Sequence, residues 1–378
     1  MVVVSLTTPA TQGITVRDAE PGDNDALVAI AAACSMEGDI ALRVTREPDF
    51  FQLARLEGSA WRVGVAEVDG CVVGCVMGAV RQAYLHGVAQ PTLYAGDLKV
   101  HPAARRAGVA DALSEWVRCA LAEMGGSDTP LLLTILAGNR AMEHRAAGRG
   151  LVPRFGHFAT IRVFSIPLLF SRREATDGLV IAPARACDLL EMAELWARVA
   201  AHRQFAPAFT ADSLAAWIQA APSLAITDYR VARDRRGRIV GFLGWWDQES
   251  FKQMQVTRYS PRLRVARGIV NALGGLTGGV GLPEVGGSLR HRTAVHVCVP
   301  PEHPEVLRAL LRRSHAELRA TRYAFATIGL DLCDPLCSAL DGLFAQPTNV
   351  NAYVCTPGGD YVGPPLADRP LHYEIALV

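Results

Sequence analysis

Short apolar runs with a two-residue period alternate with longer amphipathic segments along the chain. Two such runs, 61–68 and 71–80, flank Asp69-Gly70, which predicts a β-hairpin. Apolar residues spaced at about 3.6 positions predict a helix at 24–33 and another from the turn after Pro102 to Glu123. Because hairpins interrupt the alternation of strand and helix, the pattern excludes a purely doubly wound sheet and favours a mixed one.

The same order of elements occurs in both halves of the chain. In the first half we predict strands at 14–17, 61–68, 71–80, 93–100, 131–136, 151–155 and 158–166, with helices at 24–33, 48–56, after 102 and from 139. In the second half we predict strands at 179–181, 229–232, 239–246, 293–299 and 324–330, with helices at 187–200, 211–219, 304–320 and 334–344. These elements predict an α/β protein with a mixed sheet. A tail (1–13) precedes two domains of similar plan, 14–170 and 171–378, joined in the polar segment 170–177.

Composition narrows the classes of partner. With 378 residues, 50% of them hydrophobic and 20% charged, the chain is typical of a folded protein with two cores. Its net charge of +1 provides no field for nucleic acid or a membrane surface, so we expect neither as a partner. The first residues lack the positively charged segment and the long apolar segment of a signal peptide, which predicts a cytoplasmic protein. Nine scattered cysteines without CxxC spacing predict no metal site.

The turn that follows the predicted strand 93–100 carries the clearest chemistry. After His101-Pro102 the chain reads Arg-x-x-Gly-x-Ala and then continues as a helix. Successive main-chain amides at such a helix start form a concave site for an anion, and the helix dipole adds to the attraction. A glycine allows close approach of a phosphate, and arginines add charged hydrogen bonds. The predicted ligands of a diphosphate are Arg105, Arg106, Ala107, Gly108, Val109 and Ala110.

This turn, in this order of elements, resembles the pyrophosphate signature of the GCN5-related N-acetyltransferase (GNAT) superfamily. The resemblance covers 14–166, and the whole chain is similar to the tandem GNAT proteins of bacterial genomes. It implies acetyl-CoA, or another acyl-CoA, as co-substrate. It also implies that the strand segment Leu98, Lys99 and Val100 pairs with the pantetheine arm, and that Asn139 binds pantetheine or positions the acceptor.

One position departs from the family pattern. A tyrosine that reprotonates the departing thiolate is usual four residues before the glycine that ends the helix after 139, and here Ala146 stands there. Another group or water then does this work, or the domain is not an orthodox acetyltransferase.

Acetyl transfer to an amine needs a group that removes a proton. Asp97, beside the strand segment that would contact the thioester, is the first candidate, although it could simply pair with Lys99. The amide of Leu98 would stabilise the oxyanion, as the resemblance implies. Weaker candidates are Tyr94, His86, Glu37 and Asp39, and we predict that Cys75 and Cys119 are core residues.

The second half lacks the arginine and the glycine at the corresponding segment, 299–307, and carries two acids and three prolines there. We therefore expect this half to be a degenerate copy without coenzyme binding, which shapes the acceptor site, supports a homodimer or binds another ligand. The Gly-rich stretch 274–287 is predicted to be a flexible connector.

These features predict an acyltransferase that moves an acetyl group from acetyl-CoA to a primary amine of a small molecule or peptide, by direct attack in a ternary complex. The alternatives are a non-catalytic acyl-CoA-binding module, or a GNAT-derived enzyme of another reaction class such as a decarboxylase or a longer-chain acyltransferase.

Overall fold

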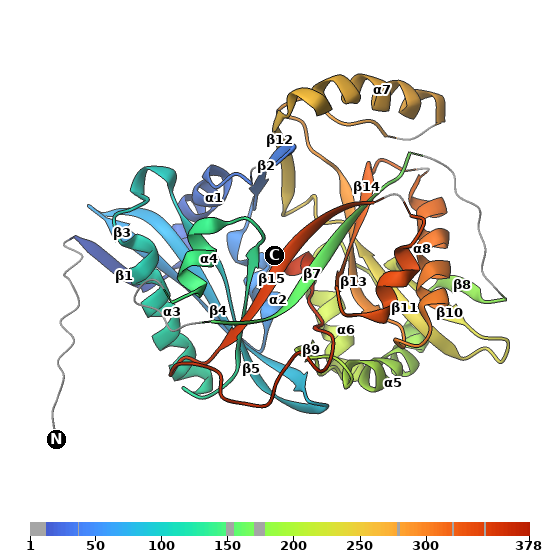
Figure 1. The fold of residues 1–378 in the computed structure, drawn as a ribbon, viewed down its shortest axis with the longest axis horizontal. Coiled ribbons are helices and arrows are strands. Elements are labelled where there is room, and N and C mark those ends of the chain that lie inside the picture. Colours follow the sequence, from blue (N-terminus) through green and yellow to red (C-terminus); the bar gives the residue numbers. More distant parts are fainter. Residues whose placement is uncertain are drawn as a thin grey trace.

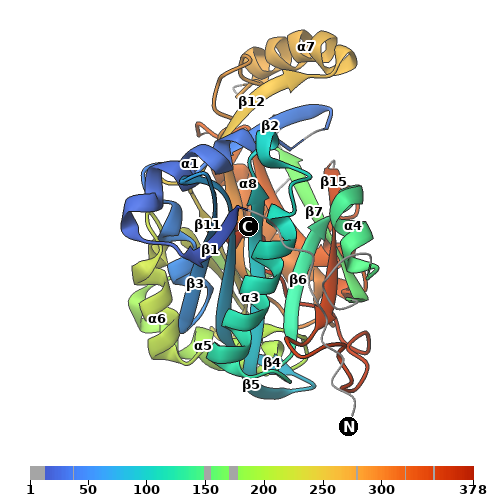
Figure 2. The same ribbon diagram turned by 90° about the vertical axis from the view of Figure 1, so that its left-hand side faces the viewer.

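A continuous β-sheet runs through both halves of the chain, as Figure 1 and Figure 2 show. The computed structural model describes residues 13–36, 38–148, 155–169, 178–277, 280–319, 321–343 and 345–378. Both parallel and antiparallel neighbours occur in the sheet, so the predicted mixed α/β class is confirmed. The predicted join at 170–177 and the segment 151–154 lie outside the described residues.

Fifteen strands are present in the described part of the chain. They are β1 (Ile14–Asp18), β2 (Ile40–Thr45), β3 (Ala60–Val68), β4 (Cys71–Leu85), β5 (Val88–Val100), β6 (Leu131–Leu136), β7 (Gly156–Pro167), β8 (Val180–Pro183), β9 (Ala206–Pro207), β10 (Tyr229–Arg233), β11 (Ile239–Trp246), β12 (Gln253–Tyr259), β13 (His291–Cys298), β14 (Phe325–Asp331) and β15 (Gln346–Cys355). The α-helices are α1 (Asn24–Ala33), α2 (Ala54–Glu57), α3 (Val109–Gly125), α4 (Arg140–Ala146), α5 (Leu189–Ala200), α6 (Ala211–Ala220), α7 (Pro261–Thr277) and α8 (Pro304–Arg319).

Most predicted elements are confirmed, and α1 and β6 have the predicted bounds. The helix predicted at 48–56 is wrong in extent, because only a 3-10 turn and the one-turn α2 form there. The helix predicted at 334–344 is instead the 3-10 helix η6 (Pro335–Leu340). The pattern missed β2, β12 and β15, and it missed α7, which occupies the start of the predicted Gly-rich connector.

The order of strands in the large sheet is symmetric about its centre. From one edge to the other it reads β1-β3-β4-β5-β6-β15-β7-β14-β13-β11-β10-β8, so that β5 and β6 of the first half correspond to β13 and β14 of the second. Each of these two pairs is parallel, whereas their outer neighbours are antiparallel. The two halves therefore share one plan.

The halves exchange a strand at the centre of the sheet. β15 of the second half lies between β6 and β7 of the first and is antiparallel to both. In return, β7 pairs with β14 over seven residue pairs, from Phe325↔Pro167 to Asp331↔Ile161. Figure 1 shows β15 in red beside the green β7. Each half thus completes its sheet with a strand of the other.

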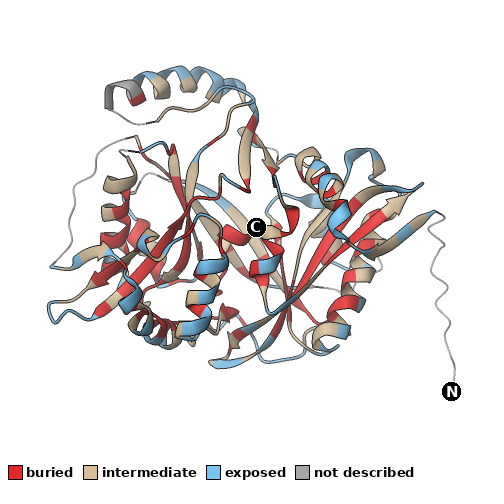
Figure 3. Ribbon diagram, turned by 180° about the vertical axis from the view of Figure 1, so that it is seen from behind, coloured by how far each residue is buried: buried red, intermediate tan, exposed pale blue. Residues whose placement is uncertain are grey.

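Helices cover both faces of the sheet. α3 and α4 contribute to one core cluster on one face of the first half, with Leu113, Leu121 and Ala146 buried. α1 lies on the opposite face, and Leu53 and Leu56, before and within α2, pack with α5 and α6 in another cluster. Figure 3 shows that buried residues follow the strands and the inner sides of these helices. A separate two-stranded sheet of β2 and β12 joins the halves above the large sheet.

The exchanged strands predict that both halves unfold together. Val354 of β15 is buried between β6 and β7, so Val354→Ala should lower the free energy of unfolding by about 1–3 kcal/mol. Hydrogen exchange should show equal loss of protection in β3 and β11. Val180→Ala on the exposed edge strand β8 is the matched control and should change little. Two denaturant transitions, of which Val354→Ala shifts only one, would contradict shared stability.

Candidate active site

The strands β5 and β6 part in the middle of the sheet. They pair in parallel only from Leu93↔Leu131 to Ala95↔Leu133, and no strand in the described residues pairs with β5 on that side beyond Ala95. On its other side, β5 carries a bulge opposite β4, and Asp97 has a φ of 54° there. The parted edge of β5 therefore presents main-chain groups, including those of Leu98, toward an opening.

The predicted anion turn leads into α3. Gly108 is the N-cap of this helix, with a φ of 83°, and Arg106 before it has a φ of 74°. Within the described residues, no protein acceptor bonds to the amides of residues 106–110, while the amide of Asp111 bonds back to Gly108. These five amides at the positive end of a 17-residue helix are thus available to an anion.

The side chains of the turn are consistent with this. Both Arg105 and Arg106 are exposed. The Nε of Arg105 lies 3.4 Å from the carbonyl oxygen of Val100, which holds the guanidinium over the end of β5. Asn139 caps α4 by accepting a hydrogen bond from the amide of Met142. The helix predicted to begin at Asn139 is therefore confirmed. The contact of Asn139 with pantetheine stays a prediction.

A cavity of about 580 Å³ extends from α3 and α4 through the parting of β5 and β6 to the second half. Its lining on the α3 side includes Val117, Arg118, Leu133, Asn139 and Met142. Its lining on the far side includes Met36, Leu42, Val44, Met254, His291, Thr293, Phe325, Thr327 and Thr348. Leu98 and Lys99 lie on the wall between these two ends. One continuous space thus joins the face of α3 and α4 to the interface between the halves.

Asp97 is held by two cations in this wall. Its carboxylate accepts hydrogen bonds from both terminal nitrogens of Arg46, at 2.5 and 2.9 Å, and from Nζ of Lys99. Burial raises the pKa of Asp97, but the charges of Arg46 and Lys99 outweigh it and hold that pKa well below its usual range. The expected pair with Lys99 exists, and the base role of Asp97 stays a prediction. A carboxylate so stabilised is a weak proton acceptor.

Lys252 is a second cavity residue of unusual character. Its Nζ donates a hydrogen bond to the main-chain oxygen of Val378 and lies 3.4 Å from the oxygen of Ala376. Burial, with Arg46 nearby, lowers the pKa of this lysine to about 7. Near neutral pH an appreciable fraction of its amine is therefore free of its proton.

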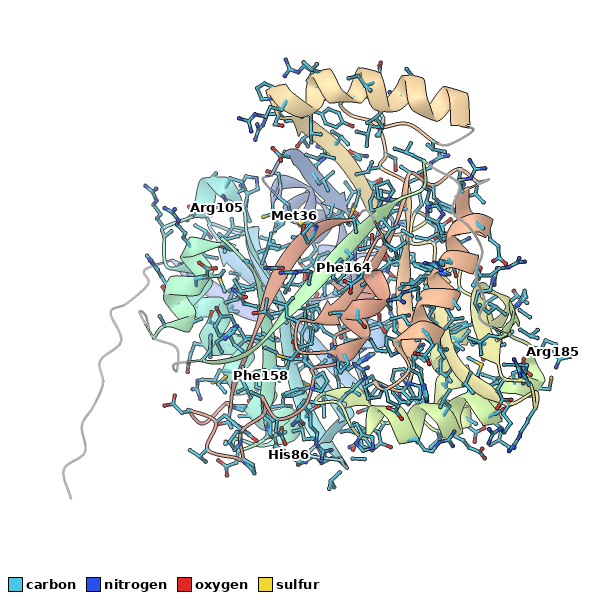
Figure 4. The ribbon with its side chains drawn as sticks, turned by 45° about the vertical axis from the view of Figure 1, so that its right-hand side comes forward. Met36, His86, Arg105, Phe158, Phe164 and Arg185 are labelled. Atoms are coloured by element: carbon cyan, nitrogen blue, oxygen red, sulfur yellow. The ribbon has the colours of Figure 1, made fainter. Side chains whose placement is uncertain are left out.

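The remaining predicted residues lie at varied distances from the cavity. Tyr94 is buried and stacks under the guanidinium of Arg81, whose carbon lies 4.0 Å from the ring centroid. His86 sits in the β4–β5 turn, where its amide bonds to Gln204, and Figure 4 shows it far from Met36 and Arg105. Asp39 is exposed and does not line the cavity. Glu37 lies outside the described residues.

The two cysteines that we predicted to be core residues differ in burial. Cys75 is fully buried, and burial raises the pKa of its thiol to about 12, which suits a core residue. The prediction that Cys119 is a core residue is wrong, because its side chain is exposed on α3 beside Glu115 and Arg118.

Three residues of the site were missed in the sequence. Arg46 follows β2, which the pattern did not reveal, and Tyr373 belongs to a C-terminal segment without periodicity. Lys252 had a signal, since Lys99 and Lys252 are the only lysines of the chain and both line the cavity. These three residues come together at the site through contacts between segments that are far apart in the sequence.

In the second half, the cleft that corresponds to the parting of β5 and β6 is filled by protein. β13 and β14 pair only over three residues, and His296 at the bulge of β13 has a φ of 51°, like Asp97 in β5. The segment after Leu371 passes here, and the carboxylate of Glu374 accepts a hydrogen bond from the amide of His296 at 2.9 Å. A Cβ on Gly329 would lie 2.4 Å from Ile375. This cleft keeps a cavity of only about 20 Å³.

The described part of the chain shows neither a membrane-spanning helix nor a metal centre. No helix there combines the length and apolar character that crossing a membrane requires. No group of three or more His, Cys, Asp or Glu side chains in the described ranges could hold a metal ion.

Comparison with known proteins agrees with this geometry. Residues 27–146 match the family described as "Acetyltransferase (GNAT) family". No curated protein sequence matches the chain.

Solved structures cover nearly the whole fold. Saccharomyces cerevisiae N-myristoyltransferase with bound myristoyl-CoA has a TM-score of 0.62 and 12% identity, covering 95% of this chain and 85% of that one. A GCN5-related N-acetyltransferase from Sphaerobacter thermophilus has a TM-score of 0.56 and 15% identity, covering 93% and 97%. Another from Anabaena variabilis has a TM-score of 0.52 and 13% identity, covering 91% and 73%. Identities this low show the fold alone, which is that of GNAT acyltransferases.

The geometry of the turn predicts a specific loss on substitution. Gly108→Ala places a side chain where φ is positive, a cost of about 1–2 kcal/mol, so affinity for coenzyme A should fall about tenfold as the amides are reoriented. Isothermal titration calorimetry measures this affinity. Gly70→Ala, in the β3–β4 turn at a φ of 75°, is the matched control and should bind normally. Equal affinities of the two variants would argue against the turn as the diphosphate site.

Proposed function

We propose that this chain, whose residues 27–146 carry a domain of the GNAT acyltransferase family, transfers an acetyl group from acetyl-CoA to a primary amine. The observation that supports this most is the continuous cavity that leads from α3 at Ser114, one turn beyond the free amides, to the space between the two halves. An acyl-CoA with its diphosphate on residues 105–110 would send its pantetheine arm along the parted edge of β5. The acyl group would then lie near Leu98, where the acceptor arrives from the other end.

The walls of the acceptor end favour an amine with an apolar body. Met36, Leu42, Met254 and Phe325 line this end of the cavity. Among the described residues of the lining, Asp97 is the one acidic side chain, and Arg46 and Lys99 neutralise it. A polycationic acceptor would find no counter-charge here, whereas a monoamine with an aliphatic or aromatic body would bury its apolar surface.

The charges of the wall support direct attack by a neutral amine. Arg46 and Lys99 disfavour an ammonium ion beside them, which lowers the pKa of a bound amine. Its lone pair attacks the thioester carbonyl, and the amide of Leu98 would donate to the oxyanion. Lys252, with its lowered pKa, is a better proton acceptor than the ion-paired Asp97, so we propose Lys252 as the base.

A second candidate is transfer of a longer acyl chain. Its support is the size of the cavity, about 580 Å³, and the apolar residues on its α3 side, Val117, Leu133 and Met142. Myristoyl-CoA is bound in the Saccharomyces cerevisiae N-myristoyltransferase that shares the fold. Acetyl-, octanoyl- and myristoyl-CoA, compared at one acceptor, separate the two reactions.

The proposed function predicts coenzyme A binding and transfer. We expect a micromolar dissociation constant for acetyl-CoA by calorimetry, and acetylation of arylalkyl- and alkylamines at least about tenfold faster than of polyamines, because the wall lacks free acids. Release of free thiol measures the rate. Binding of coenzyme A without acetylation of any amine in the panel would leave the acyl-CoA-binding module as the function. Absence of coenzyme A binding would exclude both.

The role of Lys252 predicts a pH dependence. A base works in its deprotonated form, so kcat/KM should rise with pH through about 7 in the wild-type protein. Lys252→Met should remove this rise and lower the plateau about 10²-fold. Asp97→Asn should keep the rise but move it to lower pH, since the negative charge of Asp97 raises the pKa of Lys252. An unaltered profile in Lys252→Met, together with its loss in Asp97→Asn, would assign the base to Asp97 instead.

A further inference from the structure

Transfer from a thioester leaves a thiolate, and an acid that protonates it as it departs lowers the barrier. At the position where the family resemblance implies this acid, the buried side chain of Ala146 carries no exchangeable proton. A protein acid for this step therefore has to come from another element of the cavity wall.

Three hydroxyl groups meet where β5 and β6 part. Thr134 is the first residue of β6 beyond the last parallel pair, and its Oγ1 lies 2.6 Å from Oη of Tyr373. The hydroxyl of Tyr94 also interacts with that of Tyr373. Gly96 is the first residue of β5 beyond the same pair. It lies against the ring of Tyr94, because a Cβ on Gly96 would be 2.9 Å from Oη of Tyr94. The hydroxyl cluster thus marks the apex of the opening.

Of these three groups, Tyr373 combines access with acidity. It lines the cavity, as does Thr134, but a phenol is a much stronger acid than an aliphatic alcohol. Tyr94 is buried and does not line the cavity. Burial raises the pKa of both tyrosines, so each keeps its proton at neutral pH.

The second half holds Tyr373 in place. The residues on either side of it are anchored in the filled cleft: the amide of His372 donates to the oxygen of Gln204, and Glu374 accepts from His296. The amide of Leu371 donates to Asp331 at 2.7 Å. A cleft that lacks the coenzyme turn therefore orients the side chain of Tyr373 toward the cavity that reaches α3 of the first half.

We propose that the hydroxyl of Tyr373 is the general acid that protonates the departing coenzyme A thiolate. This assignment rests on the function proposed above. The nitrogen–carbon bond forms, the carbon–sulfur bond breaks with its electron pair on sulfur, and the phenolic proton passes to that sulfur. The proton lost by the amine is released to solvent through the base, and the Tyr373 phenolate regains a proton from solvent after coenzyme A departs.

The test compares two acyl donors that share every contact with the protein. Tyr373→Phe keeps the ring and removes the proton, so kcat with acetyl-CoA should fall about 10²-fold while calorimetric affinity for coenzyme A stays unchanged. With the acetyl selenoester of the coenzyme, whose selenol is more acidic and leaves without protonation, the deficit should shrink to about threefold. The ratio of the two rates in one sample does not depend on the fraction of folded protein.

Tyr353→Phe is the matched control, because this tyrosine lies on β15 outside the cavity lining, and both of its rates should equal those of the wild-type protein. Wild-type turnover by Tyr373→Phe, or the same deficit with thioester and selenoester, would overturn the acid role. No acetylation by the wild-type protein would instead overturn the proposed function, and this assignment with it.

Discussion

The hydrogen bonds that β15 makes with β6 and β7 are the interaction on which the rest of the structure depends. Because β15 satisfies one edge of β6 over its full length, β6 can leave β5 after three residue pairs and still belong to the sheet. The opening that results contains the cavity. The same strand leads the chain back toward the second half, so that the segment ending at Val378 returns to this cavity. The strand that completes the sheet thus also brings the C-terminal segment to the site.

The elements that the sequence could predict are those set by local chemistry. α1 and β6 have clear periods, and the turn at Gly108 needs a residue with positive φ between a proline and an apolar helix. The resemblance to GNAT proteins rests on this same local signal, and the matched residues 27–146 contain it. The missing arginine and glycine at 299–307 indicate a second half without coenzyme binding, which stays a prediction.

The elements that the sequence could not predict depend on distant partners. β15 begins with the polar run Gln-Pro-Thr-Asn, and its apolar residues Val350, Ala352 and Val354 alternate only over its second part. Its partners, β6 and β7, lie about two hundred residues away in the sequence. Arg46 follows β2, which pairs with β12 of the other half, and its ion pair with Asp97 joins residues 51 positions apart. Tyr373 and Lys252 reach the site by the same long-range packing. The spacing of residues along the sequence does not predict such long-range contacts.

The exchange of β7 and β15 also determines when the first half can fold during synthesis. The ribosome completes β6 and β7 before it begins the second half, and β15 emerges only after β14. Until then the nascent first half exposes the edges of β6 and β7 that β15 later pairs with, and other nascent chains on the same messenger could pair with these edges. Its sheet closes only after translation has passed residue 355, so the first half cannot fold to its final form while tethered alone.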